Sequence, residues 1–370
     1  MSIILFIAVL FVLILVHEWG HFIVAKKSGI RVDEFGIGFP PKAWGKKIGE
    51  TEYTLNWLPI GGFVRIFGED PTQEHYENIE DKERSFVSKP RYIQAAVLVA
   101  GVTMNIILAF ILYIGAYMLG MPAAVAEGDV ERSLDNPQLL VTTVMPDTPA
   151  DAGLRASDEI IRVTAGDTTL DSADTLTPST VSALISEHAG EEVVFELNRR
   201  NEPAKVAVVP QTGILDDEPE RAVAGFTMTL VGKEVLPFHK AVVAAGVRTY
   251  EDLLMITVGL FTFLKDAIVG TADLSTVAGP VGIAGLVGDA AALGLPWLMT
   301  FTAFISLNLA VINLLPIPAL DGGRLVFVGI EAITRKPIKP AFATRANQIG
   351  FVALLALMAL VTVSDVVKLF

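Results

Sequence analysis

Four long apolar runs divide this chain, and the first begins almost at its N-terminus. Residues 2–25 carry no charge except in a short cluster near the end of the run, and later apolar runs cover residues 93–119, 297–315 and 349–367. A helix rises about 1.5 Å per residue, so about 20 residues cross the roughly 30 Å hydrocarbon layer of a bilayer. The first run lacks the basic start and the cleavage pattern of a signal peptide. The pattern therefore predicts a polytopic α-helical membrane protein with four transmembrane helices.

A fifth apolar stretch, within residues 241–269, is shorter. Its uninterrupted core, residues 253–264, is only 12 residues long and has charged residues on both sides. That length favours an amphipathic helix that lies at the membrane interface or packs against protein. The alternative, a fifth span, would move the C-terminus to the other side of the membrane. The stretch 278–282, with two glycines and a proline, predicts a turn-rich connector after this helix.

A β-like pattern replaces the apolar runs between residues 129 and 235. A helix-like piece at 178–188 lies among four short β-rich runs, at 139–144, 159–163, 193–197 and 205–209. Short strands bounded by turn residues predict one small β-rich domain here.

The loop after the first apolar run contains a second β-like unit. Residues 52–58 and 63–67 are joined through Pro59-Ile60-Gly61-Gly62, and the glycines supply the positive φ that a tight turn needs. The pattern predicts a β-hairpin over about residues 52–67. It is apolar for a loop, so we expect it to associate with the membrane and to pack against the spans, because bare backbone is not tolerated in lipid.

The charge distribution predicts the orientation of the spans. Residues 26–91 hold 11 Lys and Arg, whereas residues 121–296 hold 11 basic and 26 acidic residues. By the positive-inside rule the first of these segments is cytoplasmic and the second is external, as are both termini. The predicted segments are residues 1–26 (first span), 27–92 (cytoplasmic loop), 93–120 (second span), 121–235 (external domain), 236–296 (amphipathic helix and connector), 297–321 (third span), 322–346 (cytoplasmic loop) and 347–370 (fourth span).

Composition limits the chemistry and the partners. Apolar residues make up 52% of the chain and the mean hydropathy is +0.53, as expected for a protein in a lipid bilayer. There is no cysteine, so a metal ion would have to be held by histidine and carboxylate. The net charge of −13 belongs mostly to the external part and argues against a nucleic acid as partner.

The charged cluster in the first run is His17-Glu18-Trp19-Gly20-His21, an HExxH pattern typical of zinc metalloproteases. On a helix His17 and His21 are i, i+4 neighbours, so both imidazoles project toward one ion about 2 Å from each nitrogen. Glu18 would lie beside the metal, which suits a general base that takes a proton from zinc-activated water. Chance would produce the pattern in on the order of one chain in three hundred of this composition. An ionisable cluster within a span also indicates function.

A catalytic zinc needs a third protein ligand, and Asp321 is the best candidate. It follows the end of the third span, where Pro316 and Pro318 cannot continue an α-helix and the backbone can aim a carboxylate sideways. The first and third spans both run from outside to inside, so Asp321 reaches the depth of the two imidazoles, near the cytoplasmic side. The alternative role for Asp321 is a cap at a helix end.

These motifs resemble the site-2 proteases, specifically the bacterial regulator-of-sigma-E type of intramembrane zinc metalloprotease. The resemblance covers nearly the whole chain and rests on residues 17–21, Gly61-Gly62-Phe63-Val64, Asn105, residues 279–283 and residues 308–321. It implies one Zn²⁺ held by His17, His21 and Asp321, with Glu18 as the base.

The same resemblance implies residues that bind the substrate. Asn313, and also Asn308, would hold the substrate backbone or the developing oxyanion. The alternative is an interhelical hydrogen bond, which we favour for Asn308 and for Asn105. The hairpin around Gly61, Gly62 and Phe63 would add a strand to an unwound substrate helix.

The external domain begins with a segment, residues 144–160, that resembles the start of a bacterial PDZ domain. The likeness implies an external β-rich PDZ-like domain that captures an extended peptide or the terminus of a substrate by strand addition. The alternative is a rigid spacer. The chain departs from the sigma-E type in having room for one such domain instead of two, and in having Arg324 where histidine often follows the double glycine. We expect His75, His188 and His239 to be surface residues.

The sequence thus predicts an endopeptidase of the bacterial plasma (inner) membrane, multi-pass, with its active site toward the cytoplasmic side. Its substrates would be single-span membrane proteins, by resemblance anti-sigma factors and remnant signal peptides, cut after another protease has removed most of their external part. Two rivals remain. A zinc transporter or metal sensor would retain its activity in a Glu18→Gln variant, and an inactive scaffold would act only through residues 129–235.

Overall fold

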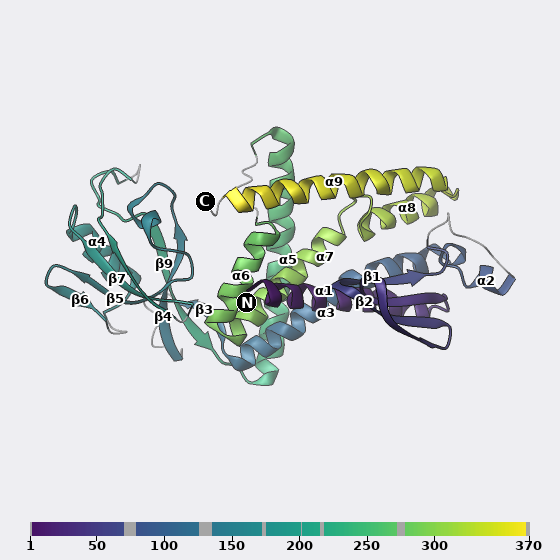
Figure 1. Cartoon of the computed structure of the whole chain (residues 1–370), viewed down its shortest axis with the longest axis horizontal. Helices are drawn as coiled ribbons and strands as arrows, with labels where there is room; N and C mark the ends of the chain where they lie inside the picture. Colours follow the sequence, from purple (N-terminus) through teal and green to yellow (C-terminus); the bar gives the residue numbers. More distant parts are fainter. Residues whose placement is uncertain are drawn as a thin grey trace. The chain divides into compact units, whose positions relative to one another are not determined.

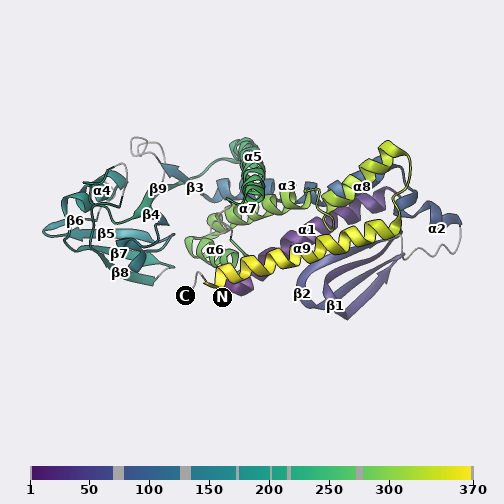
Figure 2. The same cartoon turned by 90° about the horizontal axis from the view of Figure 1, so that it is seen from above.

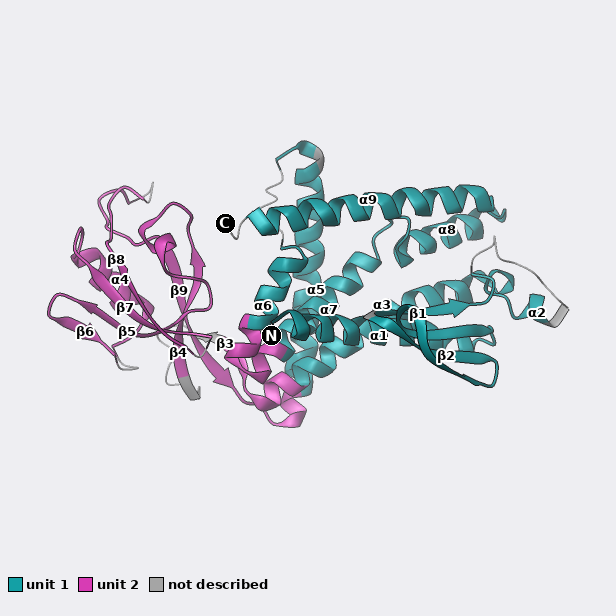
Figure 3. Ribbon diagram, viewed as in Figure 1, with its two compact units in different colours: residues 1–114, 242–288, 299–370 teal, residues 115–241, 289–298 magenta. Residues whose placement is uncertain are grey.

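The computed structural model describes residues 2–69, 79–125, 135–171, 175–200, 202–214, 218–271 and 278–367. It contains two compact units (Figure 3). Unit 1 comprises residues 1–114, 242–288 and 299–370, and unit 2 comprises residues 115–241 and 289–298. His75 lies outside the described residues.

Among the described residues, four helices are long and apolar enough to cross a membrane: α1 (Ser2–Lys27), α3 (Arg91–Leu119), α7 (Leu295–Asn313) and α9 (Pro340–Val367). They coincide with the four predicted runs, although α9 begins at Pro340, earlier than its apolar run. The shorter helices of this part are α2 (Ile79–Glu83), the 3-10 turn η2 (Phe86–Ser88) and α8 (Asp321–Thr334). α1 and α3 cross closely, since a Cβ on Gly20 would lie 2.5 Å from the carbonyl oxygen of Ala100 (Figures 1 and 2).

The predicted amphipathic helix is one long helix, α5 (Phe238–Val269). Its buried Asp252 accepts a hydrogen bond from Tyr113 of α3 and pairs with Arg248 one turn earlier on α5. The polar face of α5 is therefore used for packing against α3.

The predicted turn-rich connector over residues 278–282 is wrong, because a helix, α6 (Pro280–Leu293), begins within it. Proline suits the first turn of a helix, where its missing N–H costs nothing. Asp365 of α9 accepts the backbone N–H groups of Gly279 and Gly282 at 3.0 and 2.8 Å. A carboxylate at a helix N-terminus satisfies donors that the helix leaves free, which explains why this stretch continues as a helix.

The hairpin predicted over residues 52–67 is also wrong in its pairing. Both arms belong to β2 (Thr51–Ile66), but each pairs with β1 (Val32–Ile48) instead of with the other arm. Phe35 of β1, for example, faces Tyr53 on one side and Val64 on the other. The first half of β1 therefore lies between the two arms, and its second half pairs with the first arm. Glycines and two prolines at residues 36–41 hide this strand from a pattern-based prediction.

This sheet packs against α1. Phe22 of α1 makes edge-to-face ring contacts with Phe35 and Tyr53, with centroids 5.2 and 6.0 Å apart. The outer part of the sheet leaves large apolar side chains uncovered, with Trp57 71% exposed and Trp44 60% exposed. The sheet thus packs against α1 through Phe35 and Tyr53, and its outer part exposes large apolar side chains.

Unit 2 contains an antiparallel sheet with the strand order β3-β9-β4-β5-β7-β8, and β6 pairs with β5. The strands are β3 (Met121–Val125), β4 (Asp135–Val144), β5 (Glu159–Ala165), β6 (Thr168–Leu170), β7 (Val193–Arg199), β8 (Glu202–Val208) and β9 (Phe226–Glu234), with a 3-10 turn η3 (Pro149–Ala152) and helix α4 (Pro178–Glu187). The four predicted β-rich runs fall on β4, β5, β7 and β8. α4 packs on β5 and β9 and buries Val181, Leu184 and Ile185 in the core of this unit.

A buried ion pair fixes one end of this sheet. Asp158, just before β5, accepts two hydrogen bonds from the guanidinium of Arg199 at 2.7 and 2.6 Å and a third from the backbone of Arg155. The hydrogen bond to Asp158 raises the pKa of Arg199 above its ordinary value, although partial burial opposes the increase. The pair joins the start of β5 to the end of β7.

Candidate metal centre

Three side chains from distant parts of the sequence converge in unit 1. Nε2 of His17 lies 3.0 Å from Oδ2 of Asp321, and Nε2 of His21 lies 3.3 Å from the same oxygen. The two Nε2 atoms are 3.1 Å apart. These three residues form a group that could hold a metal ion, and both histidines are buried.

The donor atoms fit a zinc ion. Tetrahedral bonds of about 2.0–2.1 Å separate neighbouring ligand atoms by about 3.3–3.4 Å, close to the three distances found. Two imidazole nitrogens and a carboxylate oxygen at such separations can all bind one cation. Two nitrogens and one oxygen are also a ligand set that zinc uses in catalytic sites.

Helix geometry places the two imidazoles. His17 and His21 are one turn apart on α1, so their rings lie on the same face, toward α3. The facing residue on α3 is Gly101, where a Cβ would lie 2.4 Å from Nε2 of His21 and 2.8 Å from Nε2 of His17. Only glycine leaves room for both rings at this crossing.

A break between helices α7 and α8 positions the carboxylate of Asp321. α7 ends at Asn313, the segment with Pro316 and Pro318 turns, and α8 begins at Asp321, as the two prolines predict. The double glycine that follows lets α8 fold back on this segment, since a Cβ on Gly322 would lie 2.3 Å from the carbonyl oxygens of Leu314 and Leu315. Asp321 is in the first turn of α8, where a carboxylate is favourable, yet its side chain faces the imidazoles.

Each imidazole has a partner at its second nitrogen. Nδ1 of His21 lies 2.8 Å from the backbone oxygen of Val97 on α3. Nδ1 of His17 lies 3.2 Å from the side-chain amide of Asn105, one turn beyond Gly101. Such partners orient metal-binding histidines.

Glu18 directly follows His17 on α1 and has the β1–β2 sheet beside it. A Cβ on Gly62 of β2 would lie 3.9 Å from Cγ of Glu18. The second arm of β2, Gly62–Ile66, therefore starts beside Glu18.

The other predicted substrate-binding residues differ in their surroundings. Asn313, the last residue of α7, is partly exposed. Asn308 donates its amide to the carbonyl of Phe304 in its own helix at 2.8 Å, a local role. Gly61 is buried, and Phe63 stacks on Phe39 with centroids 6.4 Å apart.

The remaining described histidines lie outside this group. His188 hydrogen-bonds the carbonyl of Leu184 at the end of α4, and His239 is exposed at the start of α5. Sequence reasoning missed Gly101, and it did not connect Asn105 with His17. Their spacing of four residues on α3, the same as that of the two histidines on α1, is the signal that could have found them.

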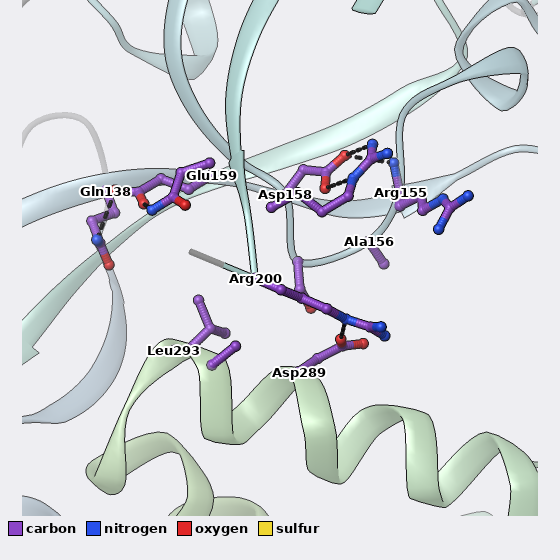
Figure 4. Close-up of a pocket in the computed structure, with 12 residues that line it drawn as sticks. Gln138, Arg155, Ala156, Asp158, Glu159, Arg200, Asp289 and Leu293 are labelled. Atoms are coloured by element: carbon purple, nitrogen blue, oxygen red, sulfur yellow. Dashed lines mark hydrogen bonds and ion pairs between the residues drawn. The ribbon is translucent and has the colours of Figure 1, made fainter. Parts of the chain in front are cut away.

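A separate cavity of about 180 Å³ in unit 2 contains none of the predicted site residues. On one wall Arg200 pairs with Asp289 at 2.6 Å, and on another Asp158 accepts a hydrogen bond from the backbone N–H of Arg155 (Figure 4). The charged groups that line it are therefore largely paired with each other.

Comparison with known proteins extends over the whole chain. The family model of peptidase family M50 matches residues 5–357. A Clostridium perfringens protein whose name describes a zinc metalloprotease is 37% identical over 358 residues, which cover 96% of this chain and 95% of the relative. Zinc metalloprotease RasP of Geobacillus kaustophilus is 30% identical, covering 100% of this chain and 98% of the relative. Regulator of sigma-W protease RasP of Bacillus subtilis is 29% identical, with coverage of 100% and 99%.

Proposed function

The chain belongs to peptidase family M50, the site-2 proteases, and is a zinc metalloprotease; from this premise we propose that it is an intramembrane endopeptidase with zinc held by His17, His21 and Asp321. The observation that carries the proposal is the convergence of two Nε2 atoms and one carboxylate oxygen from α1 and α8. A bound zinc supplies a Lewis acid that lowers the pKa of a water molecule to about 7 and polarises the scissile carbonyl.

Glu18 is the proposed general base. It neighbours His17 on α1 and lies beside both the ligand group and Gly62. A carboxylate in this place can accept the proton of the attacking water and deliver it to the leaving amine. Asn313, at the broken end of α7, is placed to offer its amide to the substrate backbone or to the oxyanion that forms.

The substrate is proposed to bind as a strand along β2. Residues Gly62–Ile66 pair with β1 on one side, and no other strand in the described part of unit 1 pairs with their second side. An extended peptide added to this edge would pass Glu18 at Gly62. A helical peptide bond is shielded by its own hydrogen bonds, so this pairing would also hold the substrate unwound for attack.

The bilayer is the proposed setting for this sheet and these helices. Four candidate spans and the charge pattern of the loops support a plasma-membrane protein with both termini and residues 121–235 outside and the metal site toward the cytoplasm. The exposed Trp44, Trp57 and Leu58 support contact of the sheet with lipid. Tryptophan favours the interface between headgroups and acyl chains.

Single-span membrane proteins are the proposed substrates. The name of the Bacillus subtilis relative assigns it to the regulation of sigma-W, which supports clients of the anti-sigma-factor type, with remnant signal peptides as a second class. Unit 2 is proposed to act as a PDZ-like module for an extended peptide. β3 covers the edge of β9 only at Leu230–Glu234, which leaves residues 226–229 of that edge without a strand partner in the described part of the sheet.

Removal of zinc tests the proposed activity. We expect the protein, reconstituted in liposomes with a single-span model substrate, to cut within or near the transmembrane helix of that substrate. Treatment with a zinc chelator should abolish cleavage, because both the attacking water and the carbonyl lose their activation, and equimolar Zn²⁺ should restore it. Cleavage products are located by mass spectrometry. A metal-free preparation that cuts at the original rate would refute the proposed function.

A further inference from the structure

Asn105 makes a contact that the reaction described above does not use. It is fully buried on α3, and its side-chain amide lies 3.2 Å from Nδ1 of His17. In this arrangement the amide nitrogen faces the ring, and the amide oxygen is buried without a hydrogen-bond partner. A buried acceptor without a donor is unfavourable, so this amide needs a physical explanation.

The second imidazole shows which protonation pattern the site requires. Nδ1 of His21 faces the carbonyl of Val97, which can only accept a hydrogen bond, so Nδ1 carries a proton, and in the neutral ring the lone pair is then on Nε2. That lone pair points toward Asp321. His21 is thus held in the form that binds a metal through Nε2.

His17 needs the same form, because its Nε2 faces the same carboxylate. An amide nitrogen that donates to Nδ1 would force the ring proton onto Nε2 and block the metal. The two ends of an asparagine amide are nearly equal in size, and the oxygen has no existing bond to lose. With the amide turned by half a rotation, the oxygen accepts the Nδ1 proton of His17.

We propose that Asn105 is a positioning residue whose amide oxygen holds His17 in the tautomer that can bind zinc through Nε2. The inference rests on the proposed function, because it takes the ion between His17, His21 and Asp321 to be the catalytic zinc. Ser306 of α7 donates its hydroxyl to the backbone carbonyl of Asn105 at 2.8 Å and does not contact the side-chain amide. The residue therefore links the helix that bears His17 with the helix that leads to Asp321.

Two substitutions separate an acceptor from a donor at this position. Asn105→Leu keeps the approximate shape and removes the acceptor, and it should weaken zinc binding about 10–100-fold, the usual cost of losing such a partner. Asn105→Asp can only accept, and it should bind zinc within about threefold of wild type or more tightly. If the amide instead donated to His17, it would oppose the metal-binding tautomer, and Asn105→Leu would then bind zinc as well as wild type or more tightly.

The measurement is the zinc dissociation constant of the full-length protein in detergent, obtained by competition with a chelator. Ser306→Ala is the matched control, because it removes a hydrogen bond to the same residue without touching the ring, and it should bind zinc like wild type. Histidine ¹⁵N spectra, recorded after His75, His188 and His239 are replaced by glutamine, give a second readout. The two remaining rings should both be protonated at Nδ1 in wild type and in Asn105→Asp.

The outcomes that would refute the role of Asn105 differ from those that would refute the proposed protease activity. Normal zinc affinity in Asn105→Leu, or equal loss in Asn105→Asp and Ser306→Ala, would overturn the role of Asn105 and leave the protease intact. A wild-type protein that binds zinc with the expected tautomers but cuts no substrate would overturn the proposed function and leave Asn105 as described.

Discussion

Replacement of Glu18 by Gln is expected to reduce the cleavage rate about 1,000-fold or more while one zinc stays bound per chain. General base catalysis contributes typically about 10²–10⁴-fold, and a 1,000-fold loss corresponds to about 4 kcal/mol in the barrier. Glutamine has the same shape but cannot accept the proton of the attacking water. Because Glu18 lies beside the ligands and is not one of them, zinc affinity should change little.

Cleavage of the reconstituted single-span substrate and zinc content are measured on the same preparation of Glu18→Gln. Glu251→Gln, an exposed glutamate on α5, is the matched control and should cut like wild type. A Glu18→Gln enzyme that keeps its rate would exclude Glu18 as the base, and it would favour a transporter or sensor that never needed one.

Replacement of Gly101 by Ala is expected to abolish both zinc binding and cleavage. The added methyl group would lie 2.4 Å from Nε2 of His21 and 2.7 Å from Cε1 of His17, well inside van der Waals contact. The backbone carbonyl of Ala100 already touches α1 at Gly20, so the two helices cannot absorb the group without parting. The rings must then leave their common point with Asp321.

Helix propensity alone would favour the Gly101→Ala substitution, so it predicts the opposite of the expected loss. Alanine stabilises a helix interior by about 1 kcal/mol relative to glycine, so a loss of function cannot come from a weaker α3. Gly259→Ala on α5 adds the same methyl group where nothing lies within 4 Å, and it should leave zinc content and cleavage unchanged. Zinc bound with wild-type affinity in Gly101→Ala would show that the histidines do not meet at α3 as described.

The convergence of His17, His21 and Asp321 could be predicted from the sequence because it depends on short spacings. The i, i+4 pair His17 and His21 needs only one helix, and the two prolines before Asp321 mark the break that turns a carboxylate toward it. The four long helices could be predicted from the apolar runs because span length is set by the thickness of the hydrocarbon layer. The resemblance to the site-2 proteases is confirmed by the match to peptidase family M50 over residues 5–357.

What could not be predicted depends on contacts between distant segments. The strand Val32–Ile37 was missed because its glycines and prolines obscure the alternation, and only pairing shows it between the arms of β2. The start of α6 looked like a turn because its stabilising carboxylate, Asp365, is far away in the sequence. Gly101 looked like any small residue in a span, since its role exists only where α1 crosses α3.

The most direct test of the central claim compares wild type with Asp321→Asn at one fixed free zinc concentration, with zinc per chain and cleavage measured on the same samples. An amide is a much weaker zinc ligand than a carboxylate. Wild type should bind one zinc per chain and cut the substrate, whereas Asp321→Asn should have a zinc content at least about tenfold lower and no detectable cleavage. Full zinc occupancy together with undiminished cleavage in Asp321→Asn would contradict it.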